Sequence, residues 1–170
     1  AGAAVAAVVA TVLVRSPVGI GTAALSLAVL STVAWRMSPT GEVTRWTTTV
    51  ALLAEVALLV LAAQGTHLQP DMHMAFFAAL AVAAAWCCPP TIVLGTAFVA
   101  VHHLALNFAY PAAVFPDGAD FSRVVIHAVI VLIEVGALIV LCWMLGKAFD
   151  TIDADTSRIQ AALAAREAAE

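Results

Sequence analysis

The stretch VVIHAVIVLIEVGALIVLCWMLG, residues 124–146, sets the class of this protein. One imidazole and one carboxylate interrupt an otherwise apolar run. A run of about 20 apolar residues is long enough to cross the ~30 Å hydrocarbon core of a bilayer as an α-helix. Because no water reaches the backbone there, its N–H and C=O groups must bond within the helix. The stretch therefore predicts a membrane-spanning helix.

The whole chain has the composition of a membrane protein. Of its 170 residues, 64% are hydrophobic and 11% are charged, whereas soluble domains have roughly 45–50% and 25%. Short breaks rich in Pro and Gly separate the apolar runs. We predict an all-α integral membrane bundle of six transmembrane helices, over residues 1–14, 18–35, 46–63, 73–86, 91–110 and 124–146. The first and fourth predicted helices are short, and the fourth could extend back toward Asp71.

Positive charges and tryptophans predict the orientation. With both termini in the cytoplasm, only Arg15 and Arg123 lie outside, as the positive-inside rule prefers. The same orientation places all four indole side chains at inner helix ends, where they favour the headgroup level: Trp35, Trp46, Trp86 and Trp143. We expect a multi-pass protein of the bacterial inner membrane.

In this topology the five histidines lie near the outer side: His67, His73, His102, His103 and His127. Asp71 belongs to the same layer. Glu134 lies two turns below His127 on the same face, since residues seven apart on a helix differ by about 20°. Glu55 lies in the middle of the third helix. The depth shared by the histidines predicts a single site.

Ionisable groups inside a span cost about 2.5–3.5 kcal/mol each on insertion scales, so they normally face a partner or a cavity. Neutral imidazole is the commonest protein metal ligand, and a carboxylate can complete a coordination sphere. We predict a site for a transition metal ion (copper, zinc or iron), with His73, His103 and His127 as the primary ligands. Further ligands or their supporting residues are expected among His67, His102, Asp71, Glu134, Asn107 and Glu55.

Three alternatives remain open at this level. A b-type haem held by histidines on facing helices would also suit the Ala-rich spans. A small proton- or metal-coupled transporter would use buried His and Glu as a relay. The histidines could also serve only as hydrogen-bonding groups between helices. No arrangement typical of a hydrolase or transferase is visible, so we expect no enzyme and no nucleic-acid partner.

The tail predicts a signalling role. Residues 148–170 contain no Gly or Pro, so the last transmembrane helix can continue into the cytoplasm. Spacings of three and four indicate a short coiled-coil seam, which implies a homodimer: Phe149, Ile152, Thr156, Ile159, Leu163 and Arg166. We expect a sensor domain over residues 1–147, with a cytoplasmic output domain on the same chain beyond residue 170.

A resemblance supports this interpretation. The segments DMHMAFFAALAVAAAW, PPTIVLGTAFVAVHHLALN and FSRVVIHAVIVLIEVG resemble the N-terminal multi-pass membrane sensor region of bacterial chemoreceptors, diguanylate cyclases and histidine kinases. In that family an acid-x-His segment opens one helix, a His-His pair ends the next, and a single His begins the last. Relatives often carry another His where Ala75 stands here. The resemblance implies a sensory input domain. Among the receptor types we expect a chemoreceptor, because the tail enters an Ala- and Glu-rich helix directly.

Overall fold

The computed structural model describes residues 16–169, and within this range the secondary structure is entirely helical. The elements, in chain order, are α2 (Pro17–Met37), α3 (Glu42–Ala62), α4 (Gln69–His73), α5 (Ala75–Ala83), η1 (Ala84–Trp86), α6 (Pro89–Ala109), η2 (Pro111–Ala113) and α7 (Phe121–Glu167). The predicted all-α class is confirmed.

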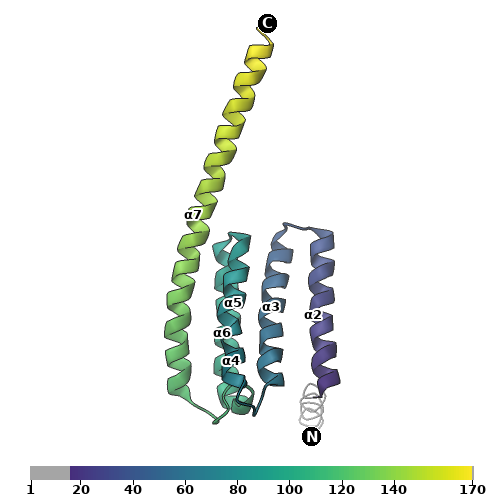
Figure 1. The fold of residues 1–170 in the computed structure, drawn as a ribbon, viewed down its shortest axis with the longest axis vertical. Helices are drawn as coiled ribbons and strands as arrows, with labels where there is room; N and C mark the ends of the chain where they lie inside the picture. Colours follow the sequence, from purple (N-terminus) through teal and green to yellow (C-terminus); the bar gives the residue numbers. More distant parts are fainter. Residues whose placement is uncertain (1–15, 170) are drawn as a thin grey trace.

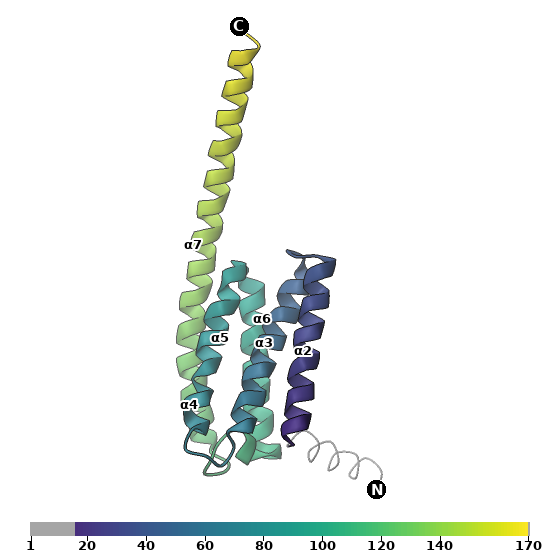
Figure 2. The ribbon, with the colours of Figure 1, turned by 45° about the vertical axis from the view of Figure 1, so that its right-hand side comes forward.

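The helices run alternately up and down as a bundle (Figure 1). Loops 38–41 and 87–88 lie at the end from which α7 projects, called here the tail end. Loops 63–68 and 110–120 lie at the opposite, distal end. In both views α2 lies on one side of the bundle and α7 on the other, with the remaining helices between them (Figure 2).

Among the described residues, four helices are long and apolar enough to cross a membrane: α2, α3, α6 and α7. α2 has no buried residue, and Leu25, Val29 and Leu30 are among its exposed side chains. An apolar exterior of this kind suits lipid rather than water. The membrane-protein class is thus supported, whereas the first predicted span, residues 1–14, lies outside the described residues.

The residues of the fourth predicted span form the short helices α4, α5 and η1, beginning at Gln69, and none of the three is long enough by itself to cross a membrane. Pro70 stands in the first turn of α4, where its missing N–H costs nothing. The Met74 N–H then bonds to Asp71 O at 3.1 Å, a tight three-residue turn that separates α4 from α5. This break sets the direction of the helix end that carries His73.

The core lies where α3, α5 and α6 meet, and Leu53, Leu80 and Ile92 are fully buried there. Gly95 of α6 allows this close approach. A Cβ at Gly95 would lie 3.1 Å from Leu53 Cδ1, 3.2 Å from Leu80 Cδ2 and 3.2 Å from Thr49 Cγ2. A larger residue would therefore push α6 away from two neighbouring helices.

α7 is a single helix of 47 residues. Its first part buries Val131, Val135 and Cys142 against the bundle. From Lys147 to Ala169 every residue is exposed, and this part extends beyond the other helices (Figure 1). The continuous helix expected from the tail sequence is present, with no contact to the rest of the described chain that would bury it.

Replacing Gly95 with Leu should destabilise the bundle by about 2 kcal/mol or more, because the side chain would overpack the core. Thermal unfolding in detergent would measure the change. Gly136→Leu on α7 is the matched control, since nothing lies within 4 Å of a Cβ at Gly136. Equal losses in both variants would contradict the close packing around Gly95.

Candidate functional site

Four of the five histidines gather near the distal end, contributed by three helices. His73 ends α4, His102 and His103 lie near the end of α6, and His127 lies two turns into α7. The closest polar contact joins His73 Nε2 and His103 Nε2 at 3.1 Å. The ring centroid of His127 is 6.0 Å from that of His73 and 6.1 Å from that of His103. We call these three rings the histidine triad.

Backbone carbonyl groups one turn earlier hold two of the triad rings. The pairs are His103 Nδ1 with Val99 O at 2.9 Å and His127 Nδ1 with Arg123 O at 2.8 Å. A carbonyl oxygen can only accept, so the bonded ring nitrogen carries the proton. The other nitrogen, Nε2, then presents a lone pair in the neutral ring. Metal-binding histidines are commonly oriented in this way.

The contact between His73 Nε2 and His103 Nε2 has the length of a hydrogen bond in which one ring nitrogen donates to the other. Because Nδ1 of His103 donates to Val99 O, Nε2 of a neutral His103 is the acceptor of this bond. A metal ion could take the place of the shared proton. Ligand nitrogens that share one ion at 2.0–2.1 Å are separated by about 3–3.4 Å. The pair thus has the spacing of two ligands of one metal ion, or of two bases that share a proton.

His127 is held less closely than this pair. Three imidazoles on one ion would have centroids about 5 Å apart, as His73 and His103 do at 5.1 Å, whereas the His127 distances are longer. Within residues 16–169, no group of three or more His, Cys, Asp or Glu side chains is arranged to hold a metal ion as it stands. A movement of about 1 Å by the His127 ring would close the triad around an ion of ordinary bond length.

His102 lies beside the triad rather than in it, with its Nδ1 3.5 Å from His103 Nδ1 and its ring centroid 5.1 Å from that of His103. Its ring stacks on Phe98 at a centroid distance of 6.3 Å and lies 5.5 Å from Phe76. Adjacent helical residues point about 100° apart, which explains why one member of the His-His pair joins the triad and the other packs on aromatic rings.

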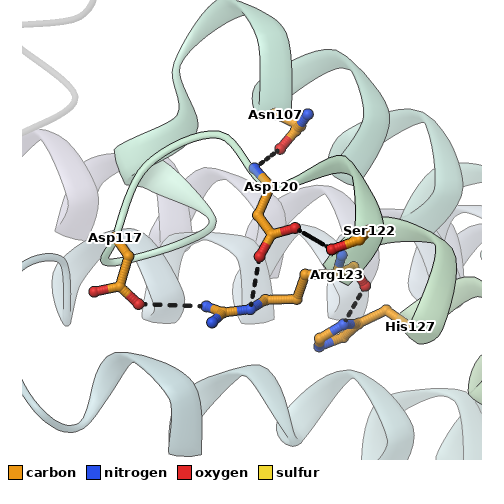
Figure 3. A network of polar contacts seen from close by, with 6 residues as sticks. All are labelled: Asn107, Asp117, Asp120, Ser122, Arg123 and His127. Carbon is orange, nitrogen blue, oxygen red and sulfur yellow. Dashed lines mark hydrogen bonds and ion pairs between the residues drawn. The ribbon is translucent and has the colours of Figure 1, made fainter.

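Phe115, in the loop before α7, closes the triad from the distal end. It is buried, stacks on His73 with an interplanar angle of 9°, and lies 5.9 Å from His127. The guanidinium of Arg123 lies 5.6 Å from the Phe115 ring. Arg123 also has carboxylates nearby, at 3.7 Å from Asp117 and 3.6 Å from Asp120 (Figure 3). Arg123, whose carbonyl oxygen bonds to His127, is therefore itself held in place by these contacts.

Asp120 and Asn107 fix the start of α7 against α6. Asp120 caps α7 by accepting from the Arg123 N–H at 3.0 Å, and its own N–H donates to Asn107 Oδ1 at 2.9 Å (Figure 3). Hydrogen bonding from Ser122 and from the Arg123 backbone lowers the pKa of Asp120. Its contribution to stability is present above its unfolded pKa and is lost as the pH falls through the folded value.

Gln69 is a positioning residue that the sequence did not indicate. Its side chain is fully buried, accepts from the Gly65 N–H at 3.1 Å and donates to Ala112 O at 3.0 Å. It thereby joins the two distal loops, directly before the short helix end that carries His73. A Gln beside Pro in a loop carries no sequence signal of this role, because its partners lie far away along the chain.

The remaining candidates lie apart from the triad. His67 and Asp71 are exposed at the distal surface, and Glu55 is half-buried on α3. Glu134 has a buried Oε2 for which no hydrogen-bond partner was found within the described part of the chain. Asn107, expected as a supporting residue, acts on the loop rather than on a ring.

Removing the amide of Asn107 should loosen the distal end. Asn107→Ala leaves the Asp120 N–H unsatisfied, which should cost about 1–3 kcal/mol in unfolding free energy. Asn107→Asp keeps an acceptor at the same place and should lose less. Hydrogen exchange of the Asp120 amide would report the change directly, and unchanged protection in Asn107→Ala would refute this role.

No protein-family model, no characterised protein and no solved structure matches this chain.

Proposed function

We propose that this chain is the membrane-embedded sensory input domain of a dimeric bacterial signalling receptor, a chemoreceptor given its Ala- and Glu-rich tail, that binds a transition metal ion through His73, His103 and His127. One observation carries the proposal. Nε2 of His73 and Nε2 of His103 lie 3.1 Å apart, and Nδ1 of His103 bonds to the carbonyl oxygen of Val99. Two ring nitrogens at this spacing can bind one metal ion in place of the proton that they share.

The proposed topology has six spans and both termini in the cytoplasm of a bacterial inner membrane. It makes the tail end cytoplasmic and the distal end periplasmic, so that the triad lies near the outer side of the membrane. Trp35, Trp46 and Trp86 lie close to helix ends at the tail end, and Lys147 begins the exposed part of α7. Both features suit the cytoplasmic headgroup level.

The triad is placed to control α7. His73 and His103 are carried by α4 and α6, whereas His127 belongs to the helix that leaves the bundle. Drawing His127 toward the other two rings by about 1 Å, as an ion would require, would tilt or shift α7 relative to them. A continuous helix can pass such a displacement to a cytoplasmic output domain, and its exposed seam would pair with the same seam of a second copy.

Copper, zinc and iron all accept imidazole ligands. Haem is a weaker candidate for the close pair, because two axial nitrogens on opposite faces of a macrocycle are separated by about 4 Å, and His73 and His103 are closer than this. A shared proton is the alternative cation, and metal analysis separates the two cases.

Metal binding is the first test. We expect the purified domain to hold about one transition metal ion per chain, with His103→Ala reducing the content tenfold or more because a ligand of the closest pair is lost. His67→Ala is the matched control, since His67 is exposed and outside the triad. Elemental analysis after dialysis gives the stoichiometry. Equal metal content in His103→Ala and the unmodified protein would refute the site.

Signal transmission is the second test. One Ala inserted directly after Lys147 rotates the rest of the helix by about 100° about its axis. This insertion should abolish output from a receptor that carries this domain. Metal content should be unchanged, because the triad lies at the other end. An insertion of seven residues restores the seam phase and should restore output. Retained output after the single insertion would contradict transmission through the helix.

A further inference from the structure

A cavity of about 270 Å³ lies between α5, α6 and α7, beside the histidine triad. His73, His103 and His127 all form part of its wall. Apart from these rings and Thr96, the lining consists of apolar side chains. The cavity therefore has three imidazole rings in one wall and almost no other group that could bind a polar solute.

The cavity opens between α6 and α7. Its lining includes Ala100 and Leu104 of α6 and Ala128 and Leu132 of α7, and all four are exposed at the surface of the bundle. Two of the four are alanine, so the side chains on facing helices are short at this place. The neighbouring surface is also apolar, with Val101 67% exposed. In a chain that crosses a membrane, this opening faces acyl chains.

We propose that the cavity is a binding site, reached sideways from the bilayer, for a small, uncharged, lipid-soluble molecule that brings one polar or metal-coordinating atom to the triad. The inference deepens the proposed function at the same site. A charged solute is excluded because an apolar wall offers no compensation for its lost hydration. The volume lies just below the ~300–1,000 Å³ of typical ligand pockets, which suits a molecule of one or two rings or smaller.

The three nitrogens favour such a ligand over the other occupants of a membrane groove. A lipid acyl chain, or the helix of a second copy, would fill the apolar part and offer no partner to Nε2 of His127, whose Nδ1 is already bonded to Arg123 O. Buried polar groups normally have one. A molecule with an apolar body and one polar atom satisfies both parts of the wall, either directly or through a metal ion held by the rings.

Chemical modification of the metal-free protein in lipid nanodiscs tests the route. Diethyl pyrocarbonate is small, uncharged and lipid-soluble, and it acylates the free nitrogen of a neutral imidazole with release of ethanol and carbon dioxide. Mass spectrometry gives the rate at each histidine. We expect His103 and His127 to react in the unmodified protein, with the exposed His67 as an internal reference for reagent in water.

Closing the opening should protect the triad. Ala100→Trp and Ala128→Trp should each slow modification of His103 and His127 by about tenfold or more, equivalent to about 1.4 kcal/mol in barrier, without slowing that of His67. Ala97→Trp is the matched control, because Ala97 is exposed on α6 but does not line the cavity. Leu132→Ala widens the opening and should speed the reaction. Because this variant changes the rate in the opposite direction, the test remains valid even if a Trp variant fails to insert into the membrane.

Equal rates at His103 in the Ala100→Trp, Leu132→Ala and Ala97→Trp variants would overturn the proposal. So would an unreactive triad in the unmodified protein beside a reactive His67, since a lipid chain or a second copy would then occupy the cavity. Because the experiment uses metal-free protein, it succeeds or fails independently of the metal analysis. If the protein binds no metal but the reagent still reaches the triad through this opening, the proposed metal site is refuted and the proposed cavity site is not.

Discussion

The contact between His73 Nε2 and His103 Nε2 is the interaction on which the site depends. His103 is bound through its other nitrogen to the Val99 carbonyl in its own helix. Such a bond fixes ring orientation at little entropic cost, because donor and acceptor belong to one helical turn. It leaves Nε2 of His103 facing Nε2 of His73. Two ring nitrogens held this close can share a proton or bind one metal ion.

The bundle holds these rings in place from its core and its distal end. Gly95 lets α6 approach α3 and α5 closely. At the distal end, Gln69 joins the two loops and Asn107 binds the start of α7. α7 is attached along one face only and is exposed beyond the bundle. The site is thus held by the bundle core on the side of α4 and α6, whereas α7 also carries the exposed segment that leaves the bundle.

The apolar cavity extends from the triad to the surface of the bundle between α6 and α7. A site built from imidazoles but surrounded by apolar side chains interacts weakly with ions in water and well with neutral molecules that partition into lipid. An opening between two helices also couples occupancy to helix position, because a bound molecule must hold α6 and α7 apart. Ligand access and helix movement would then depend on the same gap.

Composition and apolar run length determined the helical membrane class, because backbone bonding in lipid leaves no other choice for such runs. The spacing of His103 and His127 within long helices was enough to place them at similar depth. Only the tertiary structure decided which histidines meet: His73 meets His103, His102 packs beside His103 and between phenylalanine rings, and His67 stays at the surface. The role of Gln69 and the presence of the cavity could not be predicted from the sequence, because both depend on contacts between distant segments. Periodicity in the sequence indicates only the faces of a single helix.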